Sequence, residues 1–227
     1  FCTNKWNLKR YRLQSKIILV TTAVLILLPA IFFFLSDFAG FSMGKRILAS
    51  FFQSVTLRTA GFNTADLGAM NDSSKAIMTL MMLIGGSPGS TAGGMKTTTI
   101  AVLILNAFAT FGREAETEVF GRRFDNTVVK NAATIAILYF FLFFTGGIAI
   151  SQIEHVALSD CLFETASAVG TAGLTLGITT ELGLVSHLIL VVLMYLGRVG
   201  GLTLIYAAIS VKIQSGAKRP LDKITVG

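Results

Sequence analysis

Four long runs without a charged residue dominate this sequence of 227 residues. They are Ile17–Leu35, Ala76–Met95, Asn131–Ile153 and Leu182–Gly197. A helix needs about 20 mostly apolar residues to cross a bilayer, and these runs approach or exceed that length. Charged residues make up 14% of the chain, whereas a soluble domain carries about 25%. The sequence therefore predicts an all-α membrane protein with roughly four spans.

Basic residues gather on one side of these predicted spans. The N-terminal segment carries Lys5, Lys9, Arg10, Arg12 and Lys16, the central loop carries Arg113, Arg122, Arg123 and Lys130, and the C-terminal segment carries Lys212, Lys218, Arg219 and Lys223. The alternate loops carry only Lys45, Arg46 and Lys75. By the positive-inside rule, both termini and the central loop are cytoplasmic in a multi-pass protein of the cell membrane. This distribution explains the net charge of +7 without a nucleic-acid partner.

The central loop mixes both signs of charge. Glu114, Glu116 and Glu118 alternate with its arginines. This mixture predicts a solvated helix end, and a docking surface for a regulator is the alternative.

The sequence repeats itself under one constant shift, which moves Thr59 onto Thr171. Under this shift Thr59-Ala60-Gly61 falls on Thr171-Ala172-Gly173, Phe51 on Phe163, Gly85 on Gly197, and Thr91 on Thr203. The shared register predicts a unit of span, short re-entrant helix, Thr-Ala-Gly turn and span, which occurs twice in parallel orientation. The expected segments are a cytoplasmic segment 1–16, a first repeat 17–111 with a broken second span, a cytoplasmic loop 112–128, a second repeat 129–213 and a cytoplasmic tail 214–227.

The duplicated turn has the chemistry of a cation filter. A re-entrant helix points the partial negative charge of its C-terminal end into the membrane. The segment that follows exposes backbone carbonyls, here those of Thr59, Ala60 and Gly61 in one repeat and of Thr171, Ala172 and Gly173 in the other. Rings of such oxygens replace the hydration shell of a monovalent cation. Two repeats supply two walls of such a ring, so absent repeats or another chain must complete it.

A glycine-rich stretch breaks the second apolar run. It consists of Gly85, Gly86, Ser87, Pro88, Gly89, Ser90, Thr91, Ala92, Gly93 and Gly94, and Lys96 follows it. Five glycines and a proline cannot continue a regular helix, and broken backbone survives in a membrane only inside protein or beside a wet cavity. We interpret this stretch as a gating loop under the ion pathway. Lys96 either holds the loop closed or anchors the chain at the membrane surface.

Three charged residues have predicted roles around the filter. Arg198 stands at the position equivalent to Gly86, where it either raises an electrostatic barrier or anchors the gating loop through its carbonyls. The alternative is a buried ion pair of Arg198 with Glu164. Arg58 is expected to brace the first turn through an acidic partner, or to repel cations if it lies in the pore. Glu164 is expected to brace the second turn.

Together these motifs resemble the potassium-translocating membrane subunit of Ktr-type systems in the Trk/Ktr/HKT superfamily. The residues that carry the resemblance are Arg58–Asn63, Gly85–Lys96, Phe163–Ala168, Gly170–Leu174 and Gly197–Gly201. The chain is similar to the third and fourth of the family's four span–pore–span repeats, which together form a pseudo-fourfold cation pore. The resemblance implies potassium uptake, a gating loop in the third repeat, a homodimer with one pore per protomer, and a cytosolic ring of nucleotide-binding regulatory subunits.

The sequence shows no catalytic set of residues and no cofactor motif, so we expect a transporter rather than an enzyme. Potassium at the filter is the only metal ion expected. Three alternatives stay open at this point. The first is a sodium-coupled or sodium-selective carrier of the same superfamily, the second is an alternating-access carrier with a midplane substrate site, and the third is a scaffold whose small residues only pack helices.

Overall fold

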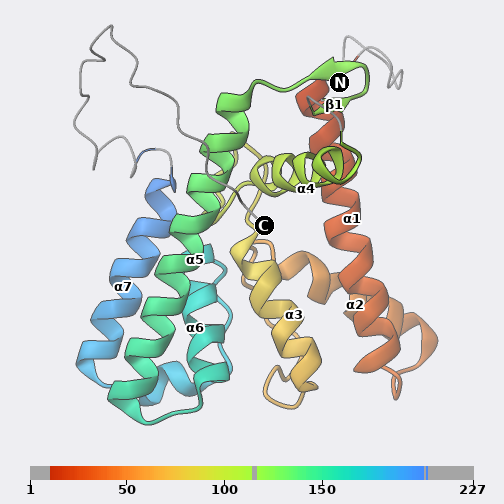
Figure 1. The fold of residues 1–227 in the computed structure, drawn as a ribbon. Helices are drawn as coiled ribbons and strands as arrows, with labels where there is room; N and C mark the ends of the chain where they lie inside the picture. Colours follow the sequence, from red (N-terminus) through yellow and green to blue (C-terminus); the bar gives the residue numbers. More distant parts are fainter. Residues whose placement is uncertain (1–10, 114–116, 202, 204–227) are drawn as a thin grey trace, which may run out of the picture.

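The computed structural model describes residues 11–113, 117–201 and 203, and most of the described residues are helical. The helices are α1 (Leu13–Ser36), α2 (Met43–Thr56), α3 (Asp72–Leu83), α4 (Thr97–Phe111), α5 (Asn126–Glu154), α6 (Leu158–Gly170) and α7 (Leu184–Val199), with a short 3₁₀ turn at Ile178–Glu181. In Figure 1, α1 and α5 run in the same direction, and α3 and α7 return in the opposite one. The predicted all-α class is confirmed.

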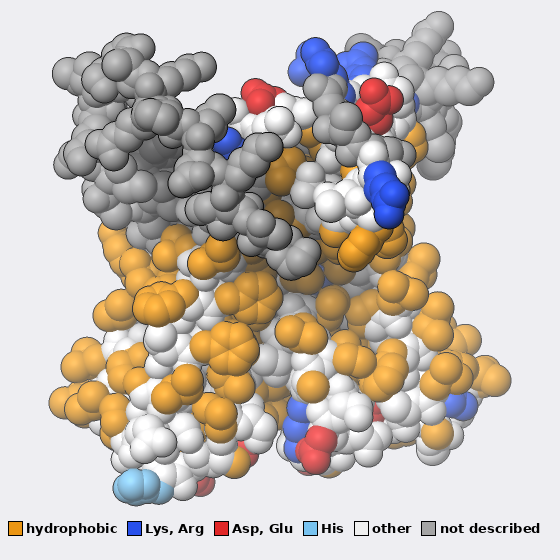
Figure 2. Space-filling view, viewed as in Figure 1, with side chains coloured by type: hydrophobic (Ala, Val, Ile, Leu, Met, Phe, Trp, Pro, Cys, Tyr) orange, Lys and Arg blue, Asp and Glu red, His pale blue; other side chains and the backbone are white. Residues whose placement is uncertain are grey.

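Among the described residues, α1 and α5 are the two helices long and apolar enough to cross a bilayer. Figure 2 shows apolar side chains over the middle of the molecule and charged side chains near its two ends. Helices α4 and α7 are apolar but shorter. The predicted segments 1–16, 112–128 and 129–213 are described only in part, and 214–227 lies outside the described residues.

The second apolar run does not form one continuous helix, because it is broken between Leu83 and Thr97. Helix α3 has 12 residues, which correspond to about 18 Å at 1.5 Å per residue. It stops at Leu83, directly before the glycine-rich stretch. Helix α4 then lies across the molecule between α1 and α5 (Figure 1) and contacts both. The glycines and the proline end α3 and turn the chain aside.

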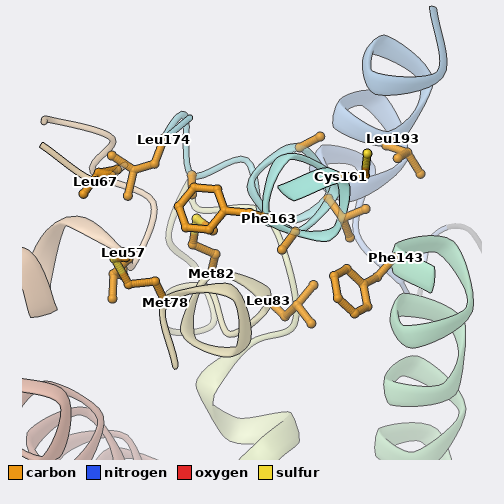
Figure 3. Close-up of a cluster of buried hydrophobic side chains, with 14 of the residues drawn as sticks. Leu57, Leu67, Met78, Met82, Leu83, Phe143, Cys161, Phe163, Leu174 and Leu193 are labelled. Atoms are coloured by element: carbon orange, nitrogen blue, oxygen red, sulfur yellow. The ribbon is translucent and has the colours of Figure 1, made fainter. Parts of the chain in front are cut away.

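Features of the two predicted repeats recur in the expected register. Helix α3 begins at Asp72 and α7 begins at Leu184, and the shift that aligns the two Thr-Ala-Gly turns also aligns these two residues. The halves are joined by apolar packing, in which Phe163 of α6 points toward Met82 of α3 (Figure 3). Both side chains are completely buried. Burial of each contributes about 1.5–3 kcal/mol, so this contact helps to hold α3 and α6 together.

A carboxylate at the end of each long helix caps the returning helix of the same half. Asp37 accepts a hydrogen bond from the Asn71 N–H at 3.0 Å and another from the Ser74 hydroxyl. Glu154 accepts equivalent bonds from the Gly183 N–H at 2.8 Å and from the Ser186 hydroxyl. These carboxylates satisfy free N–H groups at the positive ends of α3 and α7. The repeat shift aligns the donor residues of the two halves with each other, but it does not align Asp37 with Glu154. The sequence repeat therefore does not predict that these two carboxylates have the same role.

The central loop forms a β-hairpin, and the predicted solvated helix end is wrong for the residues described. Strand β1 (Glu118–Val119) pairs with the antiparallel strand β2 (Arg122–Arg123). The two residues between them, Phe120 and Gly121, have φ values of 53° and 71°. Two consecutive positive φ angles favour a tight hairpin over a helix. Glu114 and Glu116 lie outside the described residues.

Asp125 caps the N-terminus of α5, because its side chain accepts a hydrogen bond from the Thr127 N–H at 3.0 Å. This bond holds the pKa of the Asp125 carboxyl below its ordinary value, since it stabilises the ionised form. An N-cap of this kind fixes where the longest helix starts.

Candidate functional site

The two Thr-Ala-Gly turns lie against each other. They follow the C-terminal ends of α2 and α6, the ends that carry partial negative charge. A Cβ atom placed on Gly61 would lie 2.4 Å from the carbonyl oxygen of Ala172 and 3.6 Å from the Cα of Gly173. The fold thus brings Gly61 of the first predicted filter segment against Ala172 and Gly173 of the second. The six predicted filter residues contribute main-chain carbonyls and two threonine hydroxyls, and none of them carries a charged side chain.

The backbone of both turns is left-handed at the same two places. Gly61 and Gly173 have φ values of 76° and 85°, which is the freedom expected of glycine. Thr59 and Thr171 also have positive φ values, 64° and 52°. A β-branched residue in this region costs about 1–3 kcal/mol. The sequence did not reveal this strain, and its recurrence in both turns shows that the two segments share one backbone conformation.

Local hydrogen bonds hold the strained turns in place. The N–H groups of Ala60 and Gly61 both donate to the carbonyl of Thr56, at 3.2 and 3.3 Å. In the second turn, the Ala172 N–H donates to the carbonyl of Ser167 at 2.8 Å. Each turn is therefore tied back to the last turn of its own helix.

The glycine-rich stretch is a closed loop rather than an open one. Its two ends pair, because the Gly85 N–H donates to the Met95 carbonyl at 2.7 Å and the Met95 N–H donates to the Leu83 carbonyl at 3.0 Å. The Thr97 N–H donates to the Gly86 carbonyl at 3.1 Å. These bonds cross-link the neck of the loop and replace the helical bonds that its glycines interrupt. We call residues 85–96 the gating loop below, after the role that the sequence predicts for them.

Two glycines allow main chains to touch at this neck and beneath the second turn. A Cβ atom on Gly85 would lie 1.8 Å from the carbonyl oxygen of Gly93, and one on Gly197 would lie 2.0 Å from that of Val169. No side chain fits at either distance. The two glycines, which the sequence shift also aligns, therefore keep the neck of the gating loop closed and α7 tightly packed against the end of α6.

The gating loop also touches the second turn through a polar contact. The Gly93 N–H donates to the Thr171 hydroxyl oxygen at 3.0 Å, and the Gly94 N–H donates to the Gly197 carbonyl at 3.3 Å. These contacts join segments that are far apart in the sequence. No motif or spacing in the sequence predicted either of them.

The basic residues predicted for the gate all donate to carbonyls of this loop. Arg198 donates through Nη1 to the carbonyl of Thr91. Lys96 donates through Nζ to the carbonyls of Ala92 and Ser90. Of the roles considered from the sequence, anchoring of the loop by Arg198 and by Lys96 agrees with these contacts.

Arg58 also contacts the loop rather than an acidic group. Its Nη2 lies 3.4 Å from the carbonyl oxygen of Gly85, and no described acidic residue forms an ion pair with it. The expectation of an acidic partner is not met among the described residues. Arg58 lines a cavity of about 410 Å³, together with Thr22 of α1 and with Ser90 and Thr91 of the gating loop. It therefore lies between the first turn and the loop.

Glu164 is buried, with 4% of its surface exposed, and it binds the segment that follows the second turn. Its carboxylate accepts hydrogen bonds from the Thr175 hydroxyl at 2.6 Å, the Leu176 N–H at 2.9 Å and the Thr179 hydroxyl at 2.6 Å. The alternative ion pair with Arg198 does not form. The three donors to Glu164 lie just beyond Gly173, as a bracing role requires.

Comparison with known proteins identifies the family. Residues 12–217 match the TrkH family, which is described as a cation transport protein. The potassium/sodium uptake protein NtpJ of Enterococcus hirae is 33% identical over 97% of this chain and 51% of its own length. The Ktr system potassium uptake protein B of Bacillus subtilis is 32% identical over 96% of this chain and 50% of its own.

The fold has a counterpart among solved structures. The crystal structure of the potassium transporter TrkH from Vibrio parahaemolyticus superposes with a TM-score of 0.70 at 21% identity, over 86% of this chain and 44% of that one. The chain spans about half the length of the curated relatives it matches. Since the family match covers nearly all of the sequence, the chain belongs to the TrkH family of membrane cation transporters, which are not enzymes.

Proposed function

We propose that this chain forms half of a channel-like pore for potassium uptake across the cell membrane. The observation that carries this proposal is the contact between the two Thr-Ala-Gly turns, with positive φ angles at the same two positions of each. The names of the relatives, which are potassium or potassium/sodium uptake proteins, support it.

The filter acts through main-chain oxygens. The carbonyls of Thr59, Ala60 and Gly61 and those of Thr171, Ala172 and Gly173 replace water around a dehydrated potassium ion. The C-terminal ends of α2 and α6 add negative potential at the same place. Selection of potassium as substrate then needs no charged side chain and no cofactor.

The gating loop closes the pathway beneath the filter. Its carbonyls hold Arg198, Lys96 and Arg58, so positive charge is concentrated below a cation filter. Such charge repels a passing cation most strongly where water is excluded. Conduction requires the loop and these charges to move aside together.

A ring of carbonyls that surrounds the ion needs more pore segments than this chain supplies. This chain spans about half the length of its relatives, which supports further repeats in the whole protein. We propose that two preceding span–pore–span repeats complete the ring, that the whole protein is a homodimer, and that a cytosolic ring of nucleotide-binding subunits regulates it. In this arrangement both termini of the chain are cytoplasmic. Below, the pore-complete protein means this chain together with the repeats that complete its pore.

Ion flux in vesicles tests the proposed function. The pore-complete protein is reconstituted, and uptake of potassium and of sodium is measured at equal gradients. Potassium uptake that does not require a sodium gradient supports a channel-like pore. Uptake that requires both ions in a fixed ratio favours a sodium-coupled carrier, and flux of sodium alone favours a sodium-selective one.

The proposed bracing role of Glu164 gives a separate prediction. Glu164→Gln replaces one acceptor oxygen by an N–H₂ group that faces donors. Hydrogen bonds to a charged group contribute about 1.5–3 kcal/mol, so we expect potassium flux to fall about tenfold or more as the segment after Gly173 loosens. The exposed Glu181→Gln serves as the control and is expected to keep normal flux. Normal flux in a well-inserted Glu164→Gln protein would contradict the bracing role.

A further inference from the structure

The carbonyl oxygen of Gly197 in α7 accepts hydrogen bonds from both the gating loop and α5. It lies in the last turn of α7, where backbone carbonyls have no partner within the helix. The helix ends at Val199, and Gly200 takes φ 90° and ψ 138°, outside the helical region. Two donors reach this oxygen at 3.3 Å each: the Gly94 N–H of the gating loop and the hydroxyl of Tyr139 in α5.

Tyr139 is held firmly at this point. It is one of the largest completely enclosed side chains, with 1% of its surface exposed. A Cβ atom on Gly201 would lie 3.0 Å from the Tyr139 ring. The ring therefore packs closely against the main chain at Gly201. A buried tyrosine hydroxyl needs a polar partner, and here the Gly197 carbonyl provides it.

We infer that Tyr139 is a positioning residue for the gate, whose hydroxyl fixes the Gly197 carbonyl where it receives the Gly94 N–H and so holds the gating loop closed. This inference rests on the proposed function of the loop and adds α5 to its control. The neighbouring anchor, Arg198, follows Gly197 directly, so the same hydroxyl also sets where the guanidinium reaches the loop. Displacement of the end of α7 relative to α5 would release both contacts at once.

Tyr139→Phe removes only the hydroxyl and leaves the ring in place. The Gly197 carbonyl keeps the Gly94 N–H as a donor, so this buried oxygen is not left without a partner and folding should survive. The loss of one hydrogen bond changes an equilibrium by about two- to tenfold. We expect potassium flux of the pore-complete protein to rise by this factor, with an unchanged ratio of potassium to sodium flux, because the filter is untouched. Tyr195→Phe, on an exposed part of α7, is the matched control and should behave as wild type.

A protein with a shortened gating loop distinguishes a positioning role of Tyr139 from a merely structural one. In a protein whose gating loop is shortened between Gly86 and Gly93, Tyr139→Phe should have no further effect, since the contact it controls no longer closes the pore. An equal effect in both backgrounds, or a changed ion ratio, would overturn the inference.

A probe of the loop itself complements the flux data. With Ser90→Cys in a Cys2→Ser, Cys161→Ala protein, Tyr139→Phe should raise the rate of modification by a thiol reagent applied from the cytoplasmic side. An unchanged rate would also overturn the inference.

If shortening the loop fails to raise flux at all, the gate proposal fails. If shortening raises flux and Tyr139→Phe does not, only the role of Tyr139 fails.

Discussion

Arg198→Ala in the pore-complete protein is expected to raise potassium flux about tenfold. The substitution removes the bond from Nη1 to the Thr91 carbonyl and removes a positive charge from beneath the filter. A hydrogen bond from a charged group contributes about 1.5 kcal/mol at the low end of its range, and every ~1.4 kcal/mol changes an equilibrium about tenfold. The measurement is potassium uptake into vesicles, normalised to inserted protein. Shortening the loop between Gly86 and Gly93 should raise flux at least as much.

A lysine at the same position separates the two proposed actions of Arg198. Arg198→Lys keeps the charge but loses the planar guanidinium that reaches Thr91. If the charge is the barrier, this variant stays close to wild type. If the anchor is what closes the loop, its flux approaches that of Arg198→Ala. Unchanged flux in Arg198→Ala and in the shortened loop, with both proteins properly inserted, would contradict the gate altogether.

Gly61→Ala is expected to abolish most potassium flux, with a fall of more than tenfold. The added Cβ atom would lie 2.4 Å from the carbonyl oxygen of Ala172, one of the proposed filter oxygens. Alanine also costs about 1–2 kcal/mol in a left-handed backbone, and φ at Gly61 is 76°. Both effects push apart the two turns that must converge on the ion. Potassium and sodium fluxes should be measured together, because a displaced filter also discriminates poorly.

Alanine substitutions at two other glycines are expected to reduce potassium flux less than Gly61→Ala does. Gly173→Ala introduces the same backbone strain, but its Cβ atom would lie 3.8 Å from the nearest atom, the Cα of Gly61, so its effect should be smaller than that of Gly61→Ala. Gly121→Ala, in the β1–β2 hairpin, has a φ of 71° and open space around its Cβ position, and it should leave flux unchanged. Equal flux in all three variants would contradict a filter built from these turns.

Much of the fold follows from local properties of the sequence. Long charge-free runs predict α1 and α5 because a bilayer requires helices of that length and polarity. The glycines and the proline predict the end of α3 because they cannot continue a helix. The internal repeat predicts the paired turns, because two copies of one motif are expected to adopt the same local structure. These inferences need no knowledge of which distant segments touch.

The partners of the charged groups, in contrast, came from long-range packing. Arg198 and Thr91 are 107 residues apart, and the sequence left Glu164 open as another partner for Arg198. In the structure, the Glu164 carboxylate instead accepts hydrogen bonds from Thr175, Leu176 and Thr179. It also turns α4 across the molecule and places the Tyr139 hydroxyl on Gly197. Close packing selects among several chemically acceptable partners. Local sequence thus specifies the long helices and the duplicated turn, whereas the groups that hold the gating loop depend on how the helices pack.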